Sequence, residues 1–351
     1  MSERTPPPSG ARRVRLRRRV ALAAGAAALS LAAAELLLAA VDAFPPQPLT
    51  HVGEHADRER RNFVADPRIG WRMRPGASFV WRTEGVDFPF RAGPDGFRVD
   101  ERDDPPPPDP AAPRIAFVGD SFTFGTGVRG AETFAERTAA RLGAAPLNRG
   151  MAGFGIDQMA CTVEHVVLPE APDLAVVAFI VDDFERSLHA WREPEGFNKP
   201  AFKLVSGALA PKTADDRPPA LLRLLDERSR LHAAFRGVMR RLATRWPVGE
   251  WWKLNAACFD AMDGATRRAG VPLLVVLIPT PDRPRPFPAL ARHLAAHGVE
   301  YVDLLAEWGR FPAECYWPRD GHLNAAGHER TGETLALCIE RRWPGRFARA
   351  R

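Results

Sequence analysis

The chain contains little cysteine: four residues in 351, at positions 161, 258, 315 and 338. None of them forms a Cys-x-x-Cys pair or a Cys/His pattern with metal-ligand spacing, so the sequence predicts no metal site. In an oxidising compartment four cysteines allow three pairings, of which Cys315–Cys338 is the first choice. The alternative is that all four are buried free thiols.

Outside its first 19 residues the chain has no excess of either charge. Seven arginines and one glutamate in residues 1–19 account for the whole formal net charge of +6. A nucleic-acid-binding protein is expected to carry its basic excess on a folded domain. We therefore expect no nucleic-acid partner, and we interpret the basic tail as a topology signal for the segment that follows it.

That segment is an apolar run from Val20 to Val41, whose one charged residue is Glu35. At about 1.5 Å per residue the run is long enough to cross the hydrocarbon core of a membrane. The arginine cluster is expected to stay in the cytoplasm, which places the rest of the chain on the other side.

Two interpretations of this run remain open. In the first it is an uncleaved anchor, and Glu35 lies near the outer end, where its side chain can reach the membrane interface. In the second it is a signal peptide with its core at Val20–Ala34, cut near Val41-Asp42-Ala43. The length favours the anchor. We therefore expect a membrane-tethered protein facing the periplasm or the cell exterior, or a secreted protein if the segment is cleaved.

Composition divides the chain into four parts. The Pro-rich stretch Phe44–Pro48 predicts a short stalk, and alternating pieces between about 62 and 100 predict a small β-rich segment. Asp104–Pro113 is typical of an extended linker. The predicted boundaries are 1–19 for a basic cytoplasmic tail, 20–43 for the anchor or signal segment, 44–112 for the stalk, β-rich segment and linker, and 113–351 for the main domain with an insertion at about 185–250.

The main domain alternates short apolar runs with helical patterns, which predicts a parallel sheet covered by helices on both faces. The expected strands are 114–118, 145–148, 174–181, 271–278 and 299–304. The expected helices are 132–142, 156–168, 250–269 and 324–341.

Polar and glycine-rich groups follow several of these strands. They are Gly119-Asp120-Ser121-Phe122, Asn148 to Gly153, Asp182-Asp183 and, near the last helix, Asp320-Gly321-His322. Ligands of parallel sheets bind outside the carboxyl ends of the strands. A hydroxyl, a base, an acid that orients the base and backbone donors for an oxyanion are what nucleophilic acyl transfer requires.

The order and spacing of these groups resemble the SGNH/GDSL hydrolase family, in particular its membrane-anchored bacterial members. The segments "VGDSFTFGTGV", "LNRGMAGFGIDQ" and "DGHLNAAGH" are similar to three of its blocks, and the resemblance covers about residues 113–345. It implies a three-layer α/β/α domain with a five-stranded parallel sheet of flavodoxin-like order. It also implies Ser121 as nucleophile, His322 as base, Asp320 as its partner, and backbone N–H groups of Ser121 and Gly153 in the oxyanion hole.

Asp182 departs from the family pattern, because it stands where the third block has an asparagine that donates to the oxyanion. An ionised carboxylate cannot donate a hydrogen bond and repels developing negative charge. Asp320 also lies two residues before His322 rather than three. Two further segments, "GPDGFRVDE" at Gly93–Glu101 and "KPAFKLVSGAL" at Lys199–Leu209, resemble membrane-anchored members but have no chemical role that the sequence reveals.

Other polar residues near the predicted site have less specific expectations. We expect Asp120 and Asp183 to brace loops, and His328 to face solvent on the last helix. Asn148 either bonds across the site or satisfies a turn. We expect Gly150 and Gly155 to be turn or close-packing glycines. We expect Trp191, Trp251 and Trp252 to be core residues, one or two of which could stack on a sugar.

The resemblance predicts an exported serine esterase or acylhydrolase that forms an acyl-enzyme. Its substrate would be a small-molecule or glycan ester, such as an O-acyl carbohydrate or lipid. One alternative is an O-acyltransferase that modifies a cell-envelope polysaccharide. Another is a non-catalytic envelope polysaccharide-binding relative, which Asp182 would favour. No metal or organic cofactor is expected, and the membrane is the expected partner of the N-terminal helix.

Overall fold

The structure is a computed structural model. It describes residues 9–41, 43, 62–101, 109–188, 191–192, 197–211, 221, 224–225, 228–243, 249–282 and 287–347. The predicted stalk at 44–48, the first half of the predicted linker and Asp42 of the predicted cleavage site lie outside these residues. The chain forms two compact units, one of Met1–Thr50 with Pro218–Arg241 and the other of His51–Arg217 with Leu242–Arg351.

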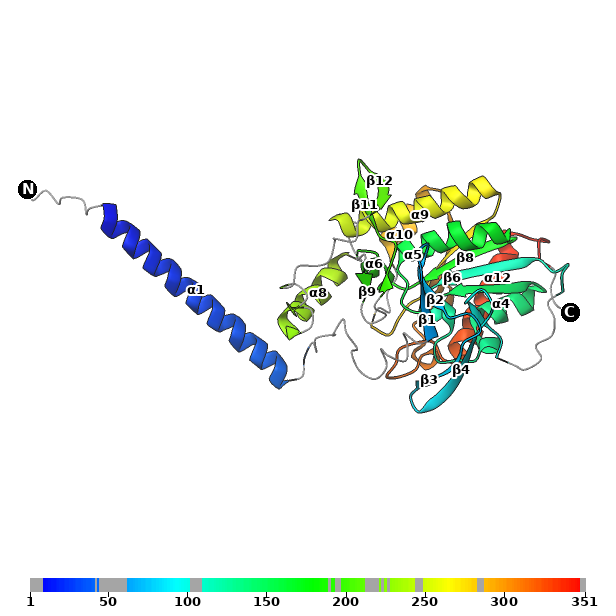
Figure 1. Ribbon diagram of the computed structural model, residues 1–351, viewed down its shortest axis with the longest axis horizontal. Coiled ribbons are helices and arrows are strands. Elements are labelled where there is room, and N and C mark those ends of the chain that lie inside the picture. The colour runs from blue at the N-terminus through cyan, green and yellow to red at the C-terminus, as the bar shows by residue number, and fades with distance from the viewer. Residues whose placement is uncertain are drawn as a thin grey trace, which may run out of the picture. The chain divides into compact units, whose positions relative to one another are not determined.

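Within its described residues, the smaller unit includes α1 (Ser9–Ala40) and most of α8 (Arg230–Ala243). Within α1 (Figure 1), the stretch Arg17–Ala40 is long and apolar enough to cross a membrane by length and composition. The carboxylate of Glu35 accepts hydrogen bonds from Ser229 Oγ at 3.0 Å and from the backbone N–H groups that begin α8. The one acidic residue of the apolar run therefore caps a second helix.

The larger unit is built on a five-stranded parallel sheet, as predicted. Its strands lie in the order β14-β13-β8-β6-β7, which is the flavodoxin-like order of the sequence prediction. The strands are β6 (Arg114–Gly119), β7 (Ala145–Gly150), β8 (Leu174–Phe179), β13 (Leu273–Leu277) and β14 (Glu300–Asp303). Each lies within two residues of its predicted start.

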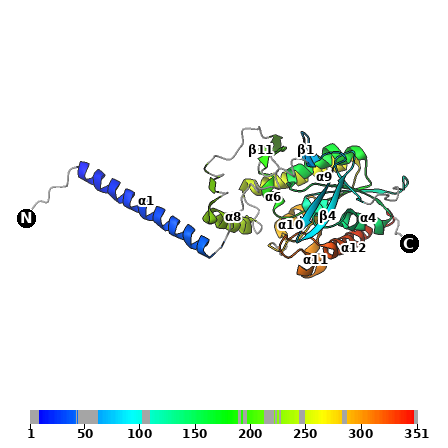
Figure 2. The same ribbon diagram turned by 60° about the horizontal axis from the view of Figure 1, so that its bottom comes forward.

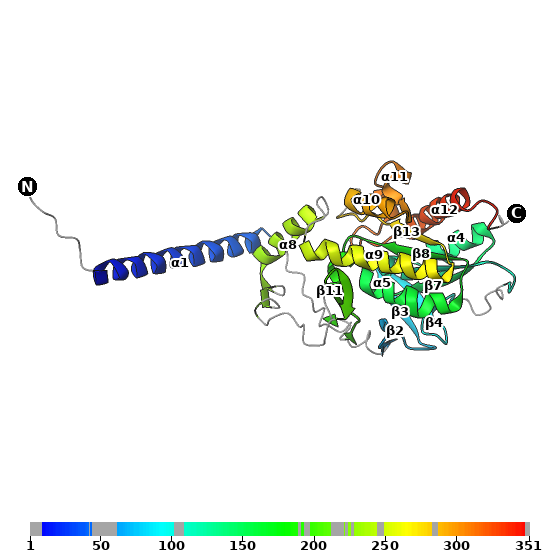
Figure 3. The same cartoon turned by 90° about the horizontal axis from the view of Figure 1, so that it is seen from above.

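Helices cover both faces of this sheet, so the fold has three layers (Figure 3). Because successive side chains of a strand point to opposite faces, Val177 joins the core beneath α5 and α9, and Val176 joins the core beneath α4 and α12. The four covering helices are α5 (Ile156–Thr162), α9 (Gly249–Ala269), α4 (Phe134–Leu142) and α12 (Ala325–Arg342). The predicted helix 156–168 continues past Thr162 as a π turn and a 3-10 turn.

Some described helices of the larger unit were not predicted, including two in the carboxyl-terminal part of the sequence. These two are α10 (Pro288–Ala296) and α11 (Leu304–Trp308) (Figure 2). The insertion contributes α6 (Asp183–Arg186) and two short hairpins, made of β9 (Trp191–Arg192) with β10 (Phe197–Asn198) and of β11 (Phe202–Val205) with β12 (Ala208–Pro211).

The predicted β-rich segment before the main domain forms two small antiparallel sheets. One pairs β1 (Phe63–Asp66) with β2 (Gly70–Met73), and the other joins β3 (Ser78–Thr83), β4 (Val86–Ala92) and β5 (Arg98–Val99). Trp71 and Phe90 are buried and share one hydrophobic cluster with Phe124 and Phe154 of the main domain. The segment is therefore part of the same core.

All four cysteines lie in the described part of the chain, and all are buried free thiols. The first-choice pairing of Cys315 with Cys338 is therefore wrong. Both belong to the core cluster beneath α12, where they pack as small apolar side chains.

The prediction for His328 is also wrong, because the residue is fully buried. It lies one turn before Gly332 on the face of α12 that meets α4. There an added Cβ at Gly332 would lie 2.5 Å from the Cβ of Arg137. The backbone N–H of Phe134 donates to His328 Nδ1 at 3.0 Å. Burial, helped by the nearby charge of Arg98, lowers the pKa of His328 to about 3.

This buried histidine makes the fold sensitive to acid. Below the pKa of about 6.5 that a histidine has in the unfolded chain, the unfolded chain binds a proton that the folded chain excludes. The free energy of unfolding therefore decreases as the pH decreases. The substitution His328→Asn keeps an acceptor for Phe134 and removes the titration. Between pH 6.5 and 5, we expect wild type to lose about 2 kcal/mol more than the variant. Urea unfolding of both proteins at the two pH values measures this, and equal losses would contradict it.

Candidate active site

Ser121 lies at the carboxyl end of β6, where the strand turns sharply into α3 (Ser121–Phe124). The carboxylate of Asp120 caps this helix by accepting from the N–H of Phe122 at 2.9 Å. The turn needs glycine at 119, since an added Cβ would lie 2.3 Å from the carbonyl oxygen of Ala178. This local geometry places the hydroxyl of Ser121 at the rim of the sheet.

His322 and Asp320 lie on the loop before α12 and reach the same place. His322 Nε2 is 2.8 Å from Ser121 Oγ, and His322 Nδ1 hydrogen-bonds to Asp320 Oδ1. The imidazole also packs on Phe122, with ring centroids 4.9 Å apart. Burial alone would raise the pKa of Asp320, but its hydrogen bond and charge interaction with His322 outweigh burial and lower it. The carboxylate is therefore an acceptor for the ring.

Gly153 lies on the loop after β7 and has a φ of +84°, a conformation that favours glycine. The loop is fixed on one side by Trp71, whose indole Nε1 donates to the carbonyl of Ala152 at 3.2 Å. On the other side, Asn148 donates from Nδ2 to the carbonyl of Thr123 in α3 at 2.9 Å and accepts from the N–H of Gly150. Asn148 thus bonds both to α3 and to the backbone of its own turn.

The two other predicted glycines lie where packing is tight. An added Cβ at Gly150 would lie 2.4 Å from the backbone nitrogen of Phe124, and one at Gly155 would lie 2.9 Å from that of Ser187. Both positions therefore serve close packing between the loops.

Asp182 is half-buried and immediately precedes α6. Next to it, Arg186 joins three loops at once. Its Nη1 donates to Asp120 Oδ2 at 3.1 Å, to the carbonyl of Phe154 at 3.2 Å and to Asp183. Asp120 and Asp183 brace loops, as predicted.

The charges around Arg186 are coupled. Burial and then repulsion from Asp120 raise the pKa of Asp183 well above its ordinary value, while Arg186 opposes the shift. Burial would lower the pKa of Arg186, but the charges of Asp183, Asp120 and Asp182 raise it. The guanidinium is therefore cationic and lies among three carboxylates.

The segment Gly93–Glu101, which had no role from its sequence, supplies a buried arginine. The guanidinium of Arg98 donates to the carbonyls of Gly125 at 2.7 Å and Val128 at 2.8 Å, and to that of Phe124, at the turn that follows α3. It also pairs with Glu101 and lies 3.9 Å from the centroid of the Phe90 ring. Arg98 therefore holds the turn behind Ser121.

The segment Lys199–Leu209 supplies a second buried cation. The ammonium of Lys199 pairs with Asp157 in the first turn of α5, and neither side chain is exposed. Burial raises the pKa of Asp157, and Lys199 opposes the shift. This pair fixes the start of the helix that follows Gly153.

A further contact to the loop of Asp320 and His322 comes from Glu84, at the tip of the β3–β4 hairpin. The carboxylate of Glu84 accepts from the backbone N–H of Arg319 at 2.5 Å and of Asp320 at 3.1 Å. Glu84 has a φ of +49°, which is unfavourable for a residue with a side chain. Sequence reasoning missed Glu84, Arg98 and Arg186, although the Glu84-Gly85 pair is a turn signal and Arg98 lies in a segment that was singled out.

The model of the GDSL-like Lipase/Acylhydrolase family matches residues 117–330, more than half of the chain. No curated protein matches the chain. Similar solved structures include a lipase/acylhydrolase from Enterococcus faecalis, at 16% identity and a TM-score of 0.39, covering 68% of this chain and 99% of that one. Another is a catalytic mutant of an acetylxylan esterase from Geobacillus stearothermophilus, at 15% identity and a TM-score of 0.39, covering 70% and 100%. On the family match, this chain belongs to the GDSL-like lipase/acylhydrolase family.

Proposed function

We propose that the chain is a membrane-anchored serine esterase facing the periplasm or the cell exterior, with Ser121 as its nucleophile. The observation that carries the proposal is the 2.8 Å contact between Ser121 Oγ and His322 Nε2, on a ring whose Nδ1 is bonded to Asp320. A carboxylate accepts but does not donate, so Nδ1 carries the proton and Nε2 presents a lone pair to the hydroxyl. This is the protonation state that a general base requires.

In the proposed reaction, Ser121 Oγ attacks the ester carbonyl while His322 Nε2 takes the hydroxyl proton. Asp320 holds the ring and stabilises the imidazolium. His322 then returns the proton to the departing alcohol as the bond from carbon to that oxygen breaks. Water, deprotonated by the same nitrogen, releases the acid and restores Ser121.

The backbone N–H groups of Ser121 and Gly153 are the proposed oxyanion donors. Ser121 is the first residue of α3, and the first N–H groups of a helix have no acceptor within it. Asp182 would add no donor, and its charge opposes that of an oxyanion. Arg186, whose pKa Asp182 helps to raise, offsets part of that charge. We expect an active enzyme whose kcat is lower than that of a site with three oxyanion donors.

The proposed membrane placement agrees with the position of Glu35. A carboxylate in contact with lipid is unfavourable. In this chain it instead accepts three hydrogen bonds at the start of α8, so its polar atoms have partners. The anchor would keep the site near O-acyl carbohydrates or lipids of the cell envelope, the substrate class that we propose.

Substitution of Ser121 and Asp182 tests the proposed chemistry in the full chain in detergent, with p-nitrophenyl acetate as substrate. We expect Ser121→Ala to lower kcat by at least about a thousandfold, because the nucleophile is lost. We expect Asp182→Asn to raise kcat by about tenfold or more, because an amide can donate to the oxyanion. Ser206→Ala, at the exposed tip of the β11–β12 hairpin, is the matched control and should leave kcat unchanged.

Activity that survives in Ser121→Ala would refute the assignment of the nucleophile. An inert wild type with an active Asp182→Asn would instead mark the native chain as a binding relative. Adding a free glycan separates hydrolysis from transfer, because an acylated glycan product would favour the O-acyltransferase alternative.

Glu84 is proposed to position the loop that carries Asp320 and His322. The substitution Glu84→Asn suits the left-handed backbone better but shortens the side chain, so the contact with the loop is lost. We expect kcat to fall by about tenfold with KM unchanged, since misplacement of a catalytic group costs rate. Thermal stability should not fall. Glu84→Gln, which keeps an acceptor at the same reach, should retain most of the activity.

Asp87→Asn is the matched control for Glu84, because Asp87 is an acidic residue of the same hairpin and pairs with Arg82 of that hairpin at 2.6 Å. Steady-state kinetics and thermal unfolding of the three variants check the prediction. Wild-type kcat in Glu84→Asn would show that the loop holds its geometry without this contact.

A further inference from the structure

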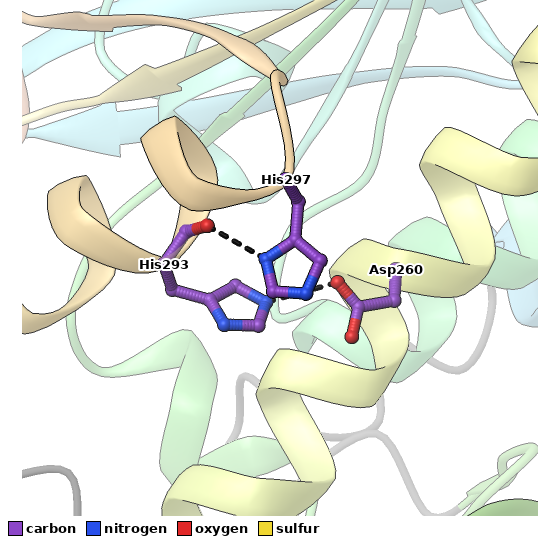
Figure 4. A group of neighbouring side chains, drawn as sticks. All are labelled: Asp260, His293 and His297. Atoms are coloured by element: carbon purple, nitrogen blue, oxygen red, sulfur yellow. Dashed lines mark hydrogen bonds and ion pairs between the residues drawn. The ribbon is translucent and has the colours of Figure 1, made fainter.

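Three side chains with metal-ligating chemistry gather in the larger unit, and none of them takes part in the contacts of Ser121 described above. They are Asp260 on α9, His293 on α10, and His297, which ends α10. One ligand atom from each lies within 4.8 Å of the other two. Figure 4 shows the two imidazoles side by side, facing the carboxylate across the gap between the helices.

The helix sets the spacing of the two histidines. Residues four apart lie on one face of a helix, one turn from each other, and a pair of histidines at this spacing can bind one zinc ion. The two ring centroids are 4.2 Å apart. Trp252 packs edge-on against His293, with centroids 5.8 Å apart, and gives that ring a fixed wall.

The hydrogen bonds leave the right atoms available. His297 Nδ1 is 2.8 Å from the backbone carbonyl oxygen of His293, which accepts only, so Nδ1 holds the proton and Nε2 has a lone pair. A backbone carbonyl that fixes the other ring nitrogen is the usual support of a metal-bound histidine. His293 Nε2 lies 2.9 Å from Asp260 Oδ1. A metal ion bound between these two atoms would displace the proton of the hydrogen bond that joins them.

The charges also favour a cation. His297 follows the last turn of α10, at the negative end of the helix dipole. Asp260 adds a negative charge. The nearby cation Arg267, which donates to the carbonyl of His297, is paired with Asp263 at 2.7 Å.

We propose that Asp260, His293 and His297 bind one divalent transition-metal ion of the zinc class. Two imidazoles and one carboxylate suit Zn²⁺, Co²⁺ or Ni²⁺ better than Ca²⁺ or Mg²⁺, which prefer oxygen ligands. Ligand atoms around a tetrahedral zinc ion are about 3.4 Å apart, given bond lengths of about 2.1 Å. Rotation of the exposed His297 ring is the change that closes the site. Asp260 is 44% exposed, which leaves the fourth position to water.

The ion would fasten α10 to α9. The sequence predicts no metal site, because the two histidines are not part of a cysteine pattern and the third ligand, Asp260, comes from a different helix. The three ligands are not among the residues proposed for the ester chemistry.

Titration of the tag-free full chain with Co²⁺, after treatment with a chelator, tests the site through visible absorption. Calorimetry with Zn²⁺ gives the stoichiometry. We expect one ion per chain and a higher Tm with Zn²⁺. We expect His297→Gln and His293→Gln to weaken binding by more than about tenfold. His165→Gln, an exposed histidine elsewhere in the same unit, is the control and should bind like wild type.

Each variant is first compared with wild type by circular dichroism and by its Tm without metal, so that a folding defect is recognised. Asp260→Asn, which keeps the shape of the side chain, serves if a histidine variant does not fold. No Co²⁺ spectrum in folded wild type would overturn the proposal. Binding that persists unchanged in His297→Gln or Asp260→Asn would overturn it as well.

Discussion

The proposed chemistry depends on one hydrogen bond, between Ser121 Oγ and His322 Nε2, which joins residues 201 positions apart. A contact of this kind tolerates little displacement, because misplacement by about 1 Å can reduce a rate a hundredfold. Ser121 follows a central strand and is fixed by the sheet. His322 and Asp320 lie on a loop before α12, so the geometry depends on what holds that loop and its neighbours.

Much of that support comes from outside the matched family region of 117–330. Glu84 holds the loop of Asp320, Arg98 holds the turn behind Ser121, and Trp71 holds the loop of Gly153. Each contact joins a side chain of the preceding β-rich segment to backbone groups of a site loop. The segment is therefore best understood as a frame for the candidate site, built into the same hydrophobic core, and not as a spacer before the main domain.

The fold and the positions of the site residues could be predicted because their signals are local: apolar runs for the strands, and Gly-Asp-Ser and Asp-Gly-His after them. The contacts of Glu84, Arg98 and Arg186 could not, since each depends on which loops meet in space. His328 was mispredicted because α12 is buried on the face that meets α4, where Gly332 allows close approach. The predicted pairing of Cys315 with Cys338 was wrong because both side chains pack in the hydrophobic core as free thiols.

The most direct test of the central claim is reaction of the folded full chain with a fluorophosphonate, followed by intact-mass and peptide mass spectrometry. The reagent reacts with a serine hydroxyl that a neighbouring base activates. The account predicts one adduct per chain, on Ser121, and slower labelling in His322→Ala. Folded wild type that remains unlabelled, or that carries the adduct on another residue, would contradict it.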